Sequence, residues 1–241
     1  MAGAAASGAA PGTPAPALQI PLALPLGAPS YKRADFMLSD ANRAALQIAD
    51  GWREIDEPAL VICGPNGAGK THLAHIAAGE EAVFLSPATF AEQTHPGWRS
   101  APVVVVDDLP GEASPRAILD ALTVRSDAGA RTILVGAGDP AAWAGGFKDL
   151  ETRLQAMPRA ILDDPDEALI RAVMVKLFKD RQIDVKSAII DYAAPRLQRT
   201  FGAASAFVAL TDEAAMAANG RISLTVAQNI VGKLCEAGSP G

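Results

Sequence analysis

The chain has 241 residues and a mass of 24.8 kDa, which excludes both a small disulfide-stapled scaffold and a long multidomain enzyme. Hydrophobic residues make up 49% of the chain and aromatic residues only 5%, so we expect a globular protein with an aliphatic core. The net charge of −6 argues against a protein whose main affinity is for nucleic-acid phosphates, and we expect no direct sequence-specific DNA binding.

The two cysteines, Cys63 and Cys235, are too few for a disulfide framework, which favours a reducing compartment, and we expect the cytoplasm. Residues 1–29 contain no Lys or Arg, so they lack the basic start of a signal peptide. No apolar run approaches the roughly 18 residues that a membrane-spanning helix needs. We therefore expect no association with a membrane.

Residues 1–30 are expected to form a flexible N-terminal segment. Almost all of residues 1–17 are small and uncharged, and they bury too little surface to offset their ordering entropy. Apolar side chains return at residues 18–26, where prolines forbid a helix. An extended apolar segment near a terminus is typical of a peptide ligand. The alternative is that this stretch packs against the edge of its own domain.

From residue 40 onward the sequence predicts alternating helices and strands. The first helix covers residues 40–52 and has Ser39 or Asp40 as its N-cap. Its expected buried face consists of Ala44, Ala45, Ile48 and Ala49. Strands are predicted at residues 59–63, 82–85, 103–106 and 132–136, and helices between them at 69–79, 87–93 and 115–126. Apolar strands that alternate with helices are typical of a parallel sheet covered on both faces.

After about residue 165 the pattern predicts helices only, at residues 166–180, 186–199, 203–219 and 224–234. This part carries nine Lys and Arg residues against eight Asp and Glu residues, whereas a DNA-reading helical domain is usually strongly basic. We therefore expect an α/β domain at residues 31–164 and an all-helical domain at residues 165–241.

Residues 64–71 match the full P-loop pattern and lie between a predicted strand and a predicted helix, as that motif requires. The glycines let consecutive backbone N–H groups turn toward a β-phosphate, Lys70 reaches the β- and γ-phosphate oxygens, and Thr71 provides a Mg²⁺ ligand. The sequence therefore predicts a site for ADP or ATP with Mg²⁺. The predicted phosphate-binding residues are Gly64, Pro65, Asn66, Gly67, Ala68, Gly69, Lys70 and Thr71.

Two carboxylates, Asp107 and Asp108, follow the apolar run at residues 103–106. Because the carboxyl ends of parallel strands share one edge of a sheet, we expect Asp107 to orient the metal together with Thr71 and Asp108 to polarise water. The second acid is Asp rather than the longer Glu, so intrinsic hydrolysis is expected to be slow. The alternative is a solvated strand end, which is costly for paired acids beside bound phosphate without a cation.

Several other side chains have both a functional and a structural interpretation. Asp139 follows the strand predicted at residues 132–136, where it either senses the γ-phosphate or only starts a turn before a proline. Arg153 is either an arginine finger for a neighbouring subunit's nucleotide or a surface arginine. His72 and His75 are spaced like a metal pair but lack a third ligand, which favours packing or surface roles. Packed positions are also expected for Trp52, Trp98 and Trp143.

Taken together, these motifs resemble the AAA+ ATPases related to the bacterial replication initiator DnaA. The resemblance covers about residues 31–234 and is carried by the P-loop sequence GPNGAGKTHLAH, by the aspartates at 107–108 and by DLETRL at residues 149–154. It implies that Arg153 is an arginine finger and that the helical domain is a lid. It further implies nucleotide contacts from Phe36, Met37, Asn42 and His72, with Arg199 as the candidate for a lid arginine whose usual site falls near Gly202.

Within this family, the shorter regulators of the Hda type are the most similar in organisation. DnaA itself would continue past Gly241 into a DNA-binding domain, so recognition of double-stranded origins is not expected. The spacing of Gln19, Leu22 and Leu24 resembles a sliding-clamp peptide, with the glutamine at the rim of an apolar groove and the leucines inside it. The resemblance implies DnaA and the sliding clamp (the polymerase β subunit) as partners. It implies stimulated ATP hydrolysis by DnaA and negative regulation of replication initiation, with homo-oligomerisation left open.

Two other functions stay open on the sequence alone. One is a helicase loader or DNA-anchoring adaptor of the AAA+ class, which would bind helicase or single strands in a salt-dependent way. The other is a P-loop phosphotransferase whose helical part is a substrate lid, although no acceptor site is evident. For the regulator, we expect the main activity to be activation of a partner's ATPase.

Overall fold

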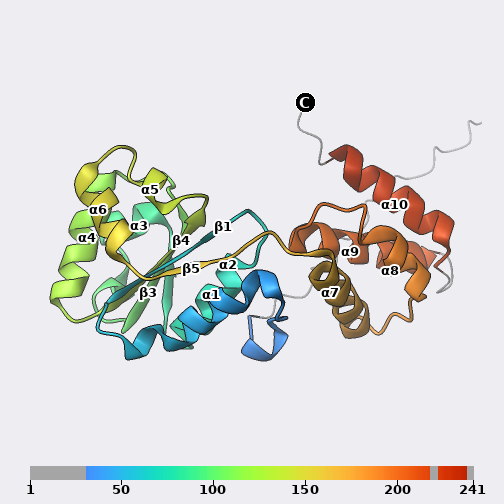
Figure 1. Cartoon of the computed structure of the whole chain (residues 1–241), viewed down its shortest axis with the longest axis horizontal. Coiled ribbons are helices and arrows are strands. Elements are labelled where there is room, and N and C mark those ends of the chain that lie inside the picture. The colour runs from blue at the N-terminus through green and yellow to red at the C-terminus, as the bar shows by residue number, and fades with distance from the viewer. Residues whose placement is uncertain (1–30, 218–221, 238–241) are drawn as a thin grey trace, which may run out of the picture.

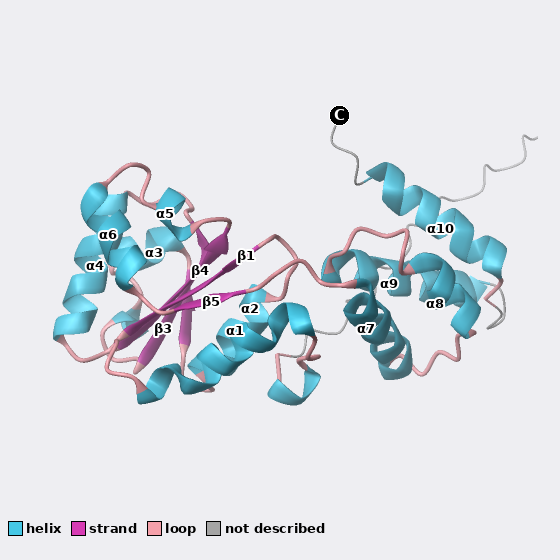
Figure 2. Ribbon diagram, in the orientation of Figure 1, coloured by secondary structure: helices cyan, strands magenta, loops and turns pink. Residues whose placement is uncertain are grey.

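The structure is a computed structural model that describes residues 31–217 and 222–237, and it has two lobes (Figure 1). One lobe holds a sheet with helices around it, and the other lobe is entirely helical (Figure 2). The expectations for residues 1–30, including the clamp peptide at Gln19, Leu22 and Leu24, lie outside the described residues.

The sheet has five parallel strands in the order β2-β3-β4-β1-β5, which confirms the predicted parallel sheet. Its strands are β1 (Ala59–Gly64), β2 (Val83–Leu85), β3 (Val103–Leu109), β4 (Arg131–Ala137) and β5 (Arg159–Ile161). The sequence pattern missed β5 because three residues that begin with an arginine carry too little apolar signal.

Six α-helices cover the two faces of the sheet. They are α1 (Asp40–Gly51), α2 (Lys70–Ala78), α3 (Pro87–Glu92), α4 (Pro115–Asp127), α5 (Pro140–Trp143) and α6 (Lys148–Ala156). The first two pack with Leu60, Ile62 and the side chains on that face of the sheet, whereas α3 to α6 pack with Val61, Val104 and the opposite face. Alternate residues of a strand point to opposite faces, so each apolar strand supplies both cores.

Ser39 is the N-cap of α1, and its N–H donates a hydrogen bond of 2.9 Å to the Asn42 side-chain oxygen. The predicted buried face of this helix was partly wrong. Asn42, Ala45, Leu46 and Ala49 are buried, whereas Ala44 and Ile48 are exposed. The buried stripe has the expected helical spacing but starts from a polar residue, which a search for apolar positions passes over.

The helical lobe contains α7 (Glu167–Asp180), α8 (Ser187–Ala193), α9 (Phe201–Ala217) and α10 (Leu224–Ala237), packed around a core that includes Met174, Phe178 and Phe207. Helix α8 ends six residues before the predicted position at Arg199 because Pro195 cannot continue it. None of the described helices is long and apolar enough to cross a membrane.

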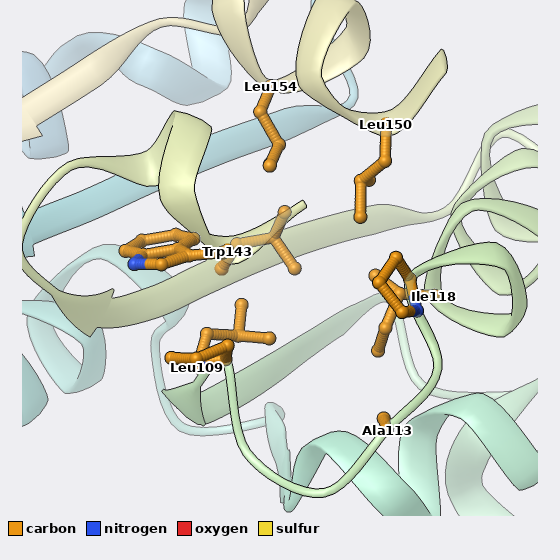
Figure 3. Close-up of a pocket in the computed structure, with 9 residues that line it drawn as sticks. Leu109, Ala113, Ile118, Trp143, Leu150 and Leu154 are labelled. Carbon is orange, nitrogen blue, oxygen red and sulfur yellow. The ribbon is translucent and has the colours of Figure 1, made fainter. Parts of the chain in front are cut away.

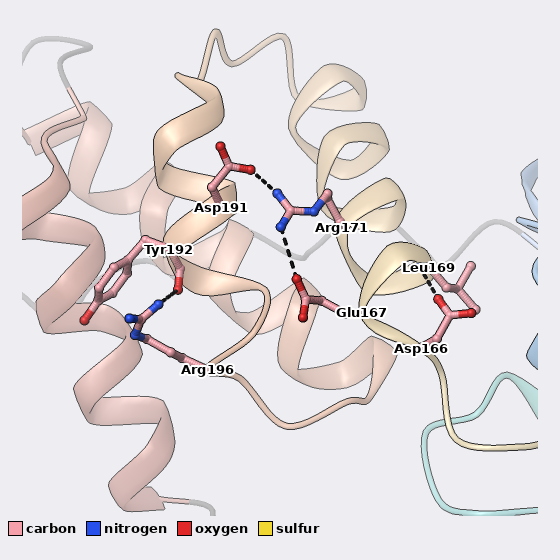
Figure 4. Close-up of polar contacts among 7 residues, drawn as sticks. All are labelled: Asp166, Glu167, Leu169, Arg171, Asp191, Tyr192 and Arg196. Carbon is pink, nitrogen blue, oxygen red and sulfur yellow. Dashed lines mark hydrogen bonds and ion pairs between the residues drawn. The ribbon is translucent and has the colours of Figure 1, made fainter.

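Polar contacts at the surface tie α7 to α8 (Figure 4). The Asp166 carboxylate caps α7 by accepting a hydrogen bond of 2.6 Å from the Leu169 N–H. Arg171 pairs with Glu167 on its own helix and with Asp191 on α8. The Arg196 guanidinium lies 4.1 Å from the centre of the Tyr192 ring and donates to the Tyr192 carbonyl.

Trp52, Trp98 and Trp143 are all buried, as predicted. Trp143 packs over Gly136 of β4, where an added Cβ would lie 2.5 Å from the Leu109 carbonyl oxygen and 2.6 Å from the indole ring. A side chain at Gly136 would therefore collide with both the β3 backbone and a buried ring.

We expect Gly136→Ala to lower the free energy of unfolding by about 1–3 kcal/mol, since overpacking a close contact forces the neighbouring groups apart. Gly51→Ala at the end of α1 is the matched control, because nothing lies within 4 Å of the Cβ it adds. Urea unfolding of the two variants measures the difference. Equal stabilities would contradict the close packing of Trp143 on β4.

Candidate nucleotide-binding site

The P-loop connects the end of β1 at Gly64 to the start of α2 at Lys70. Gly67 and Gly69 adopt positive φ angles of 77° and 91°, which residues with a side chain rarely adopt. Positive φ angles just before the start of a helix are the conformation in which the N–H groups of a P-loop curve around one point. Such a concave arrangement of donors suits a phosphate group.

Lys70 lies half-buried inside the loop. Its Nζ donates hydrogen bonds to the carbonyl oxygens of Gly64 (3.1 Å) and Pro65 (2.8 Å). Burial lowers the pKa of the Lys70 amine, and the nearby carboxylates of Asp107 and Asp108 only partly oppose that shift. A bound polyphosphate would restore the preference for the charged amine.

Thr71 and Asp107 form a second polar group beside the loop. The Thr71 hydroxyl donates to Asp107 Oδ2 at 2.8 Å, and the Asp108 N–H donates to Asp107 Oδ1 at 2.9 Å. Both carboxylate oxygens are therefore oriented by hydrogen bonds. A hydroxyl and a carboxylate are hard oxygen donors of the kind that Mg²⁺ takes alongside water and phosphate, so these residues fit the predicted metal.

A bulge in β3 places the paired aspartates. Val106 pairs with Leu134, but the next pair joins Leu109 to Gly136, so two residues of β3 are unpaired where β4 has one. Asp108 takes a positive φ of 69° and is exposed. The bulge thus directs the Asp107 carboxylate to Thr71 and leaves the Asp108 carboxylate facing solvent.

The predicted adenine-side residues gather next to α2. The Phe36 ring meets the His72 ring edge to face with 5.2 Å between centroids, and the His72 Nε2 lies 3.0 Å from the Lys32 carbonyl oxygen. Asn42 is buried, and its amide joins the Met37 carbonyl to the Ser39 N–H. Asn42 therefore shapes this segment through the backbone.

Tyr31 and Phe84, which no sequence pattern singled out, enclose His75 with their rings. The centroid of the His75 ring lies 4.1 Å from that of Tyr31 and 3.9 Å from that of Phe84. Burial and the neighbouring His72 lower the pKa of His75. Across residues 31–217 and 222–237, no three His, Cys, Asp or Glu side chains form a metal-binding group.

The helical lobe contacts the P-loop directly, through residues that the sequence did not single out. The Phe201 N–H donates to the Gly67 carbonyl at 3.2 Å. A Cβ added to Gly67 would lie 2.7 Å from the Thr200 Cβ, and one added to Gly69 would lie 2.9 Å from the Phe201 ring. Arg199 is exposed and directly precedes these residues, which places it at the same junction.

Asp139 has an observed structural role. It caps α5 by accepting a hydrogen bond of 3.0 Å from the Ala141 N–H. It follows the carboxyl end of β4, whose Ala137 pairs with Gly64 of the P-loop strand. The turn interpretation thus accounts for its hydrogen bond, and a contact with the γ-phosphate stays a prediction.

Arg153 lies away from the P-loop of its own chain. Its Nη2 is 3.9 Å from Glu57 Oε1, and Glu57 precedes the first residue of β1, whereas the P-loop follows the last. A strand of six residues separates these positions by about 20 Å. Arg153 therefore belongs to the opposite edge of the sheet.

Helix α6, which carries Arg153, packs its Leu150 and Leu154 into the core (Figure 3). Leu150 and Leu154 of this helix point toward Trp143 and line an apolar pocket with Leu109 and Ile118. Both leucines are buried, whereas the Arg153 side chain is 41% exposed. The helix is thus anchored on one side and presents its arginine on another.

No family model matches the chain, and no curated protein matches it. Solved structures do match. Domain III of the replication initiation protein DnaA from Thermotoga maritima has a TM-score of 0.71 at 16% identity, covering 86% of this chain and 98% of that one. AMPPCP-bound DnaA from Aquifex aeolicus has a TM-score of 0.63 at 17% identity, covering 76% of this chain and 65% of that one.

The Holliday junction branch migration motor RuvB from Thermotoga maritima is also similar, with a TM-score of 0.66 at 18% identity over 85% of this chain and 72% of that one. At such identities the likeness concerns the fold. The chain has an AAA+ fold, in which a parallel α/β sheet with a P-loop is followed by a helical domain.

The lowered pKa of Lys70 predicts that nucleotide affinity weakens at alkaline pH. The free amine loses its proton below the ordinary value of 10.5, and bound phosphate raises its pKa. At pH values between the pKa of Lys70 in the free protein and its pKa in the complex, nucleotide binding takes up a proton. In that range the nucleotide affinity falls about tenfold per pH unit. Calorimetry in buffers of different ionisation enthalpy measures both effects.

Lys70→Arg is the control for this pH dependence, because a guanidinium stays charged throughout the range. Its affinity should not fall with pH in the same window. The same slope in both proteins would assign the titration to another group.

Proposed function

We propose that this protein is a DnaA-related AAA+ regulator that binds adenine nucleotide and stimulates ATP hydrolysis by DnaA, so that it negatively regulates the initiation of replication. In this proposal the chain is an activator, and the hydrolysed bond belongs to its partner. The function combines a resident nucleotide site with an arginine that serves another molecule.

The position of Arg153 is the observation that carries the proposal. It is partly exposed at the amino edge of the sheet, about 20 Å from the P-loop of its own chain. A guanidinium at that edge faces outward and has donors that match phosphate oxygens. Donors that meet the charge developing on a γ-phosphate lower the barrier to hydrolysis. Arg153 would thus act on the ATP of a partner docked against this edge.

The chain's own site would have a structural role. Lys70 and the P-loop N–H groups would hold the phosphates of ADP or ATP, with Thr71 and Asp107 as ligands of Mg²⁺, which neutralises phosphate charge when it is bound. Thr200 and Phe201 already touch Gly67 and Gly69. A nucleotide here would lie between the sheet and the lid and fix the angle between them, with Arg199 as the candidate lid contact.

The comparisons support nucleotide binding at the level of the fold. Two of the similar structures are of DnaA with bound AMPPCP, and one of these also contains single-stranded DNA. For this chain we propose binding of ADP or ATP. We include no contact with single-stranded DNA, because the net charge is −6.

Clamp binding is the second part of the proposal. It rests on the spacing of Gln19, Leu22 and Leu24, which lie outside the described residues. An extended peptide of this kind would place its leucines in an apolar groove of the clamp. Binding to a clamp on DNA would then bring Arg153 close to DnaA complexes that have just initiated replication.

Replacing Arg153 with Ala is expected to lower the stimulated rate of ATP hydrolysis by DnaA about 10³-fold or more, as when an arginine finger is removed. Lys148→Ala on the same helix, with a side chain that is 82% exposed, should leave stimulation intact. Phosphate release from ATP-bound DnaA measures the rate. Unchanged stimulation by the Arg153 variant would exclude the proposed mechanism.

A variant with Gln19→Ala, Leu22→Ala and Leu24→Ala is expected to weaken clamp binding at least 100-fold, because hot-spot side chains carry most of such an interface. Titration calorimetry with purified clamp at fixed salt gives the affinity. Nucleotide affinity of the same variant is the internal control and should not change. Equal clamp affinities would remove the clamp from the proposal.

A further inference from the structure

One carboxylate oxygen of Glu57 is buried, and no hydrogen bond within the described residues explains its position. Its Oε1 is buried and accepts no hydrogen bond from any residue in the described ranges. The cation paired with this oxygen is the Arg153 guanidinium, with 3.9 Å between Oε1 and Nη2. A buried oxygen without a hydrogen-bond partner is costly, so its position calls for an explanation.

The backbone that carries Glu57 is held firmly. The Arg131 guanidinium at the start of β4 donates to the carbonyl oxygens of Trp52 (3.1 Å), Arg53 (2.8 Å), Ile55 (3.5 Å) and Glu57 (3.4 Å). The same guanidinium lies 5.1 Å from the centre of the buried Trp52 ring. The planar guanidinium of Arg131 therefore fixes the turn at residues 52–57, which leads into β1.

Arg153 approaches this turn from the other side. Its helix is anchored by the buried Leu150 and Leu154, so the base of the Arg153 side chain has a fixed position. The distance of 3.9 Å to Glu57 exceeds the usual length of a hydrogen bond. The Glu57 carboxylate thus attracts the Arg153 guanidinium by charge alone, and it uses none of the five N–H donors of the guanidinium.

We propose that Glu57 is a positioning residue for Arg153, holding the guanidinium at the amino edge of the sheet with its donors free for the γ-phosphate of the partner's ATP. This inference rests on the proposed function. An arginine that is already oriented loses less side-chain freedom between the docked complex and the transition state, where its donors meet the charge developing on the γ-phosphate. The effect is confined to the rate at saturation, because Glu57 itself does not touch the partner's nucleotide.

The test compares Glu57→Gln, which keeps the shape and removes the charge, with Glu54→Gln, which removes a charge from the same turn at an exposed position. Glu57→Gln should lower the maximal stimulated hydrolysis by DnaA about two- to fivefold, the range of a partly exposed ion pair. The concentration for half-maximal stimulation should not change. Glu57→Asp should restore part of the loss, and Glu54→Gln should behave as the unmodified protein.

A second measurement is independent of DnaA. In the isolated protein, ¹⁵N relaxation of the Arg153 Nε group should show a lower order parameter for Glu57→Gln than for Glu54→Gln. A protein in which Glu57 merely stabilises the fold would instead show a lower unfolding midpoint with unchanged order at Arg153.

The outcomes separate the two proposals. If Arg153→Ala abolishes stimulation while Glu57→Gln changes neither the maximal rate nor the order of Arg153, the positioning role is overturned and the proposed function stands. If Glu57→Gln changes only the half-maximal concentration, Glu57 contacts the partner, and the positioning role is again overturned. Unchanged stimulation by Arg153→Ala overturns both proposals.

Discussion

The polarity of the parallel sheet is the constraint on which the other features depend. All five strands run in one direction, so every strand contributes its carboxyl end to one edge and its amino end to the other. The carboxyl edge carries the P-loop and Asp107, and the amino edge carries Glu57 beside Arg153. These two sets of groups cannot meet within one chain, and the topology thereby separates the candidate nucleotide site from the partly exposed Arg153.

The sequence predicted the parts of this arrangement that are local. The P-loop between β1 and α2 and the aspartates at the end of β3 follow from consecutive residues and their spacing. Tyr31, Thr200 and Phe201 could not be found in this way, because their contacts with α2 and the P-loop join segments far apart in the chain. Likewise, Asp139 and Asn42 are polar residues at expected positions, but only the folded chain shows that they bond to nearby backbone groups.

The glycines of the P-loop serve two purposes at once. Positive φ angles at Gly67 and Gly69 turn the backbone N–H groups toward a phosphate, and the missing side chains let Thr200 and Phe201 come into contact with the loop. On the other side of the site, Lys176 of α7 pairs with Asp35 at 3.0 Å. The helical lobe therefore touches the α/β lobe at the P-loop through apolar and backbone contacts, and at Asp35 through an ion pair. A nucleotide bound between these two contacts would influence both of them.

The two cations of the proposed mechanism match their surroundings chemically. Lys70 lies in a half-buried loop, where desolvation lowers the pKa of its amine, and a bound phosphate would oppose that shift. A lysine is suited to that position because its charge is needed only in the complex. In the proposed mechanism, Arg153 must carry its charge before the partner's phosphate binds. A guanidinium stays charged at a partly exposed edge of the sheet. A lysine at residue 153 would offer a single point charge and could not match two phosphate oxygens with paired N–H donors. The arginine at residue 153 and the lysine in the P-loop therefore each suit the place, and the stage of the proposed mechanism, at which their charge is used.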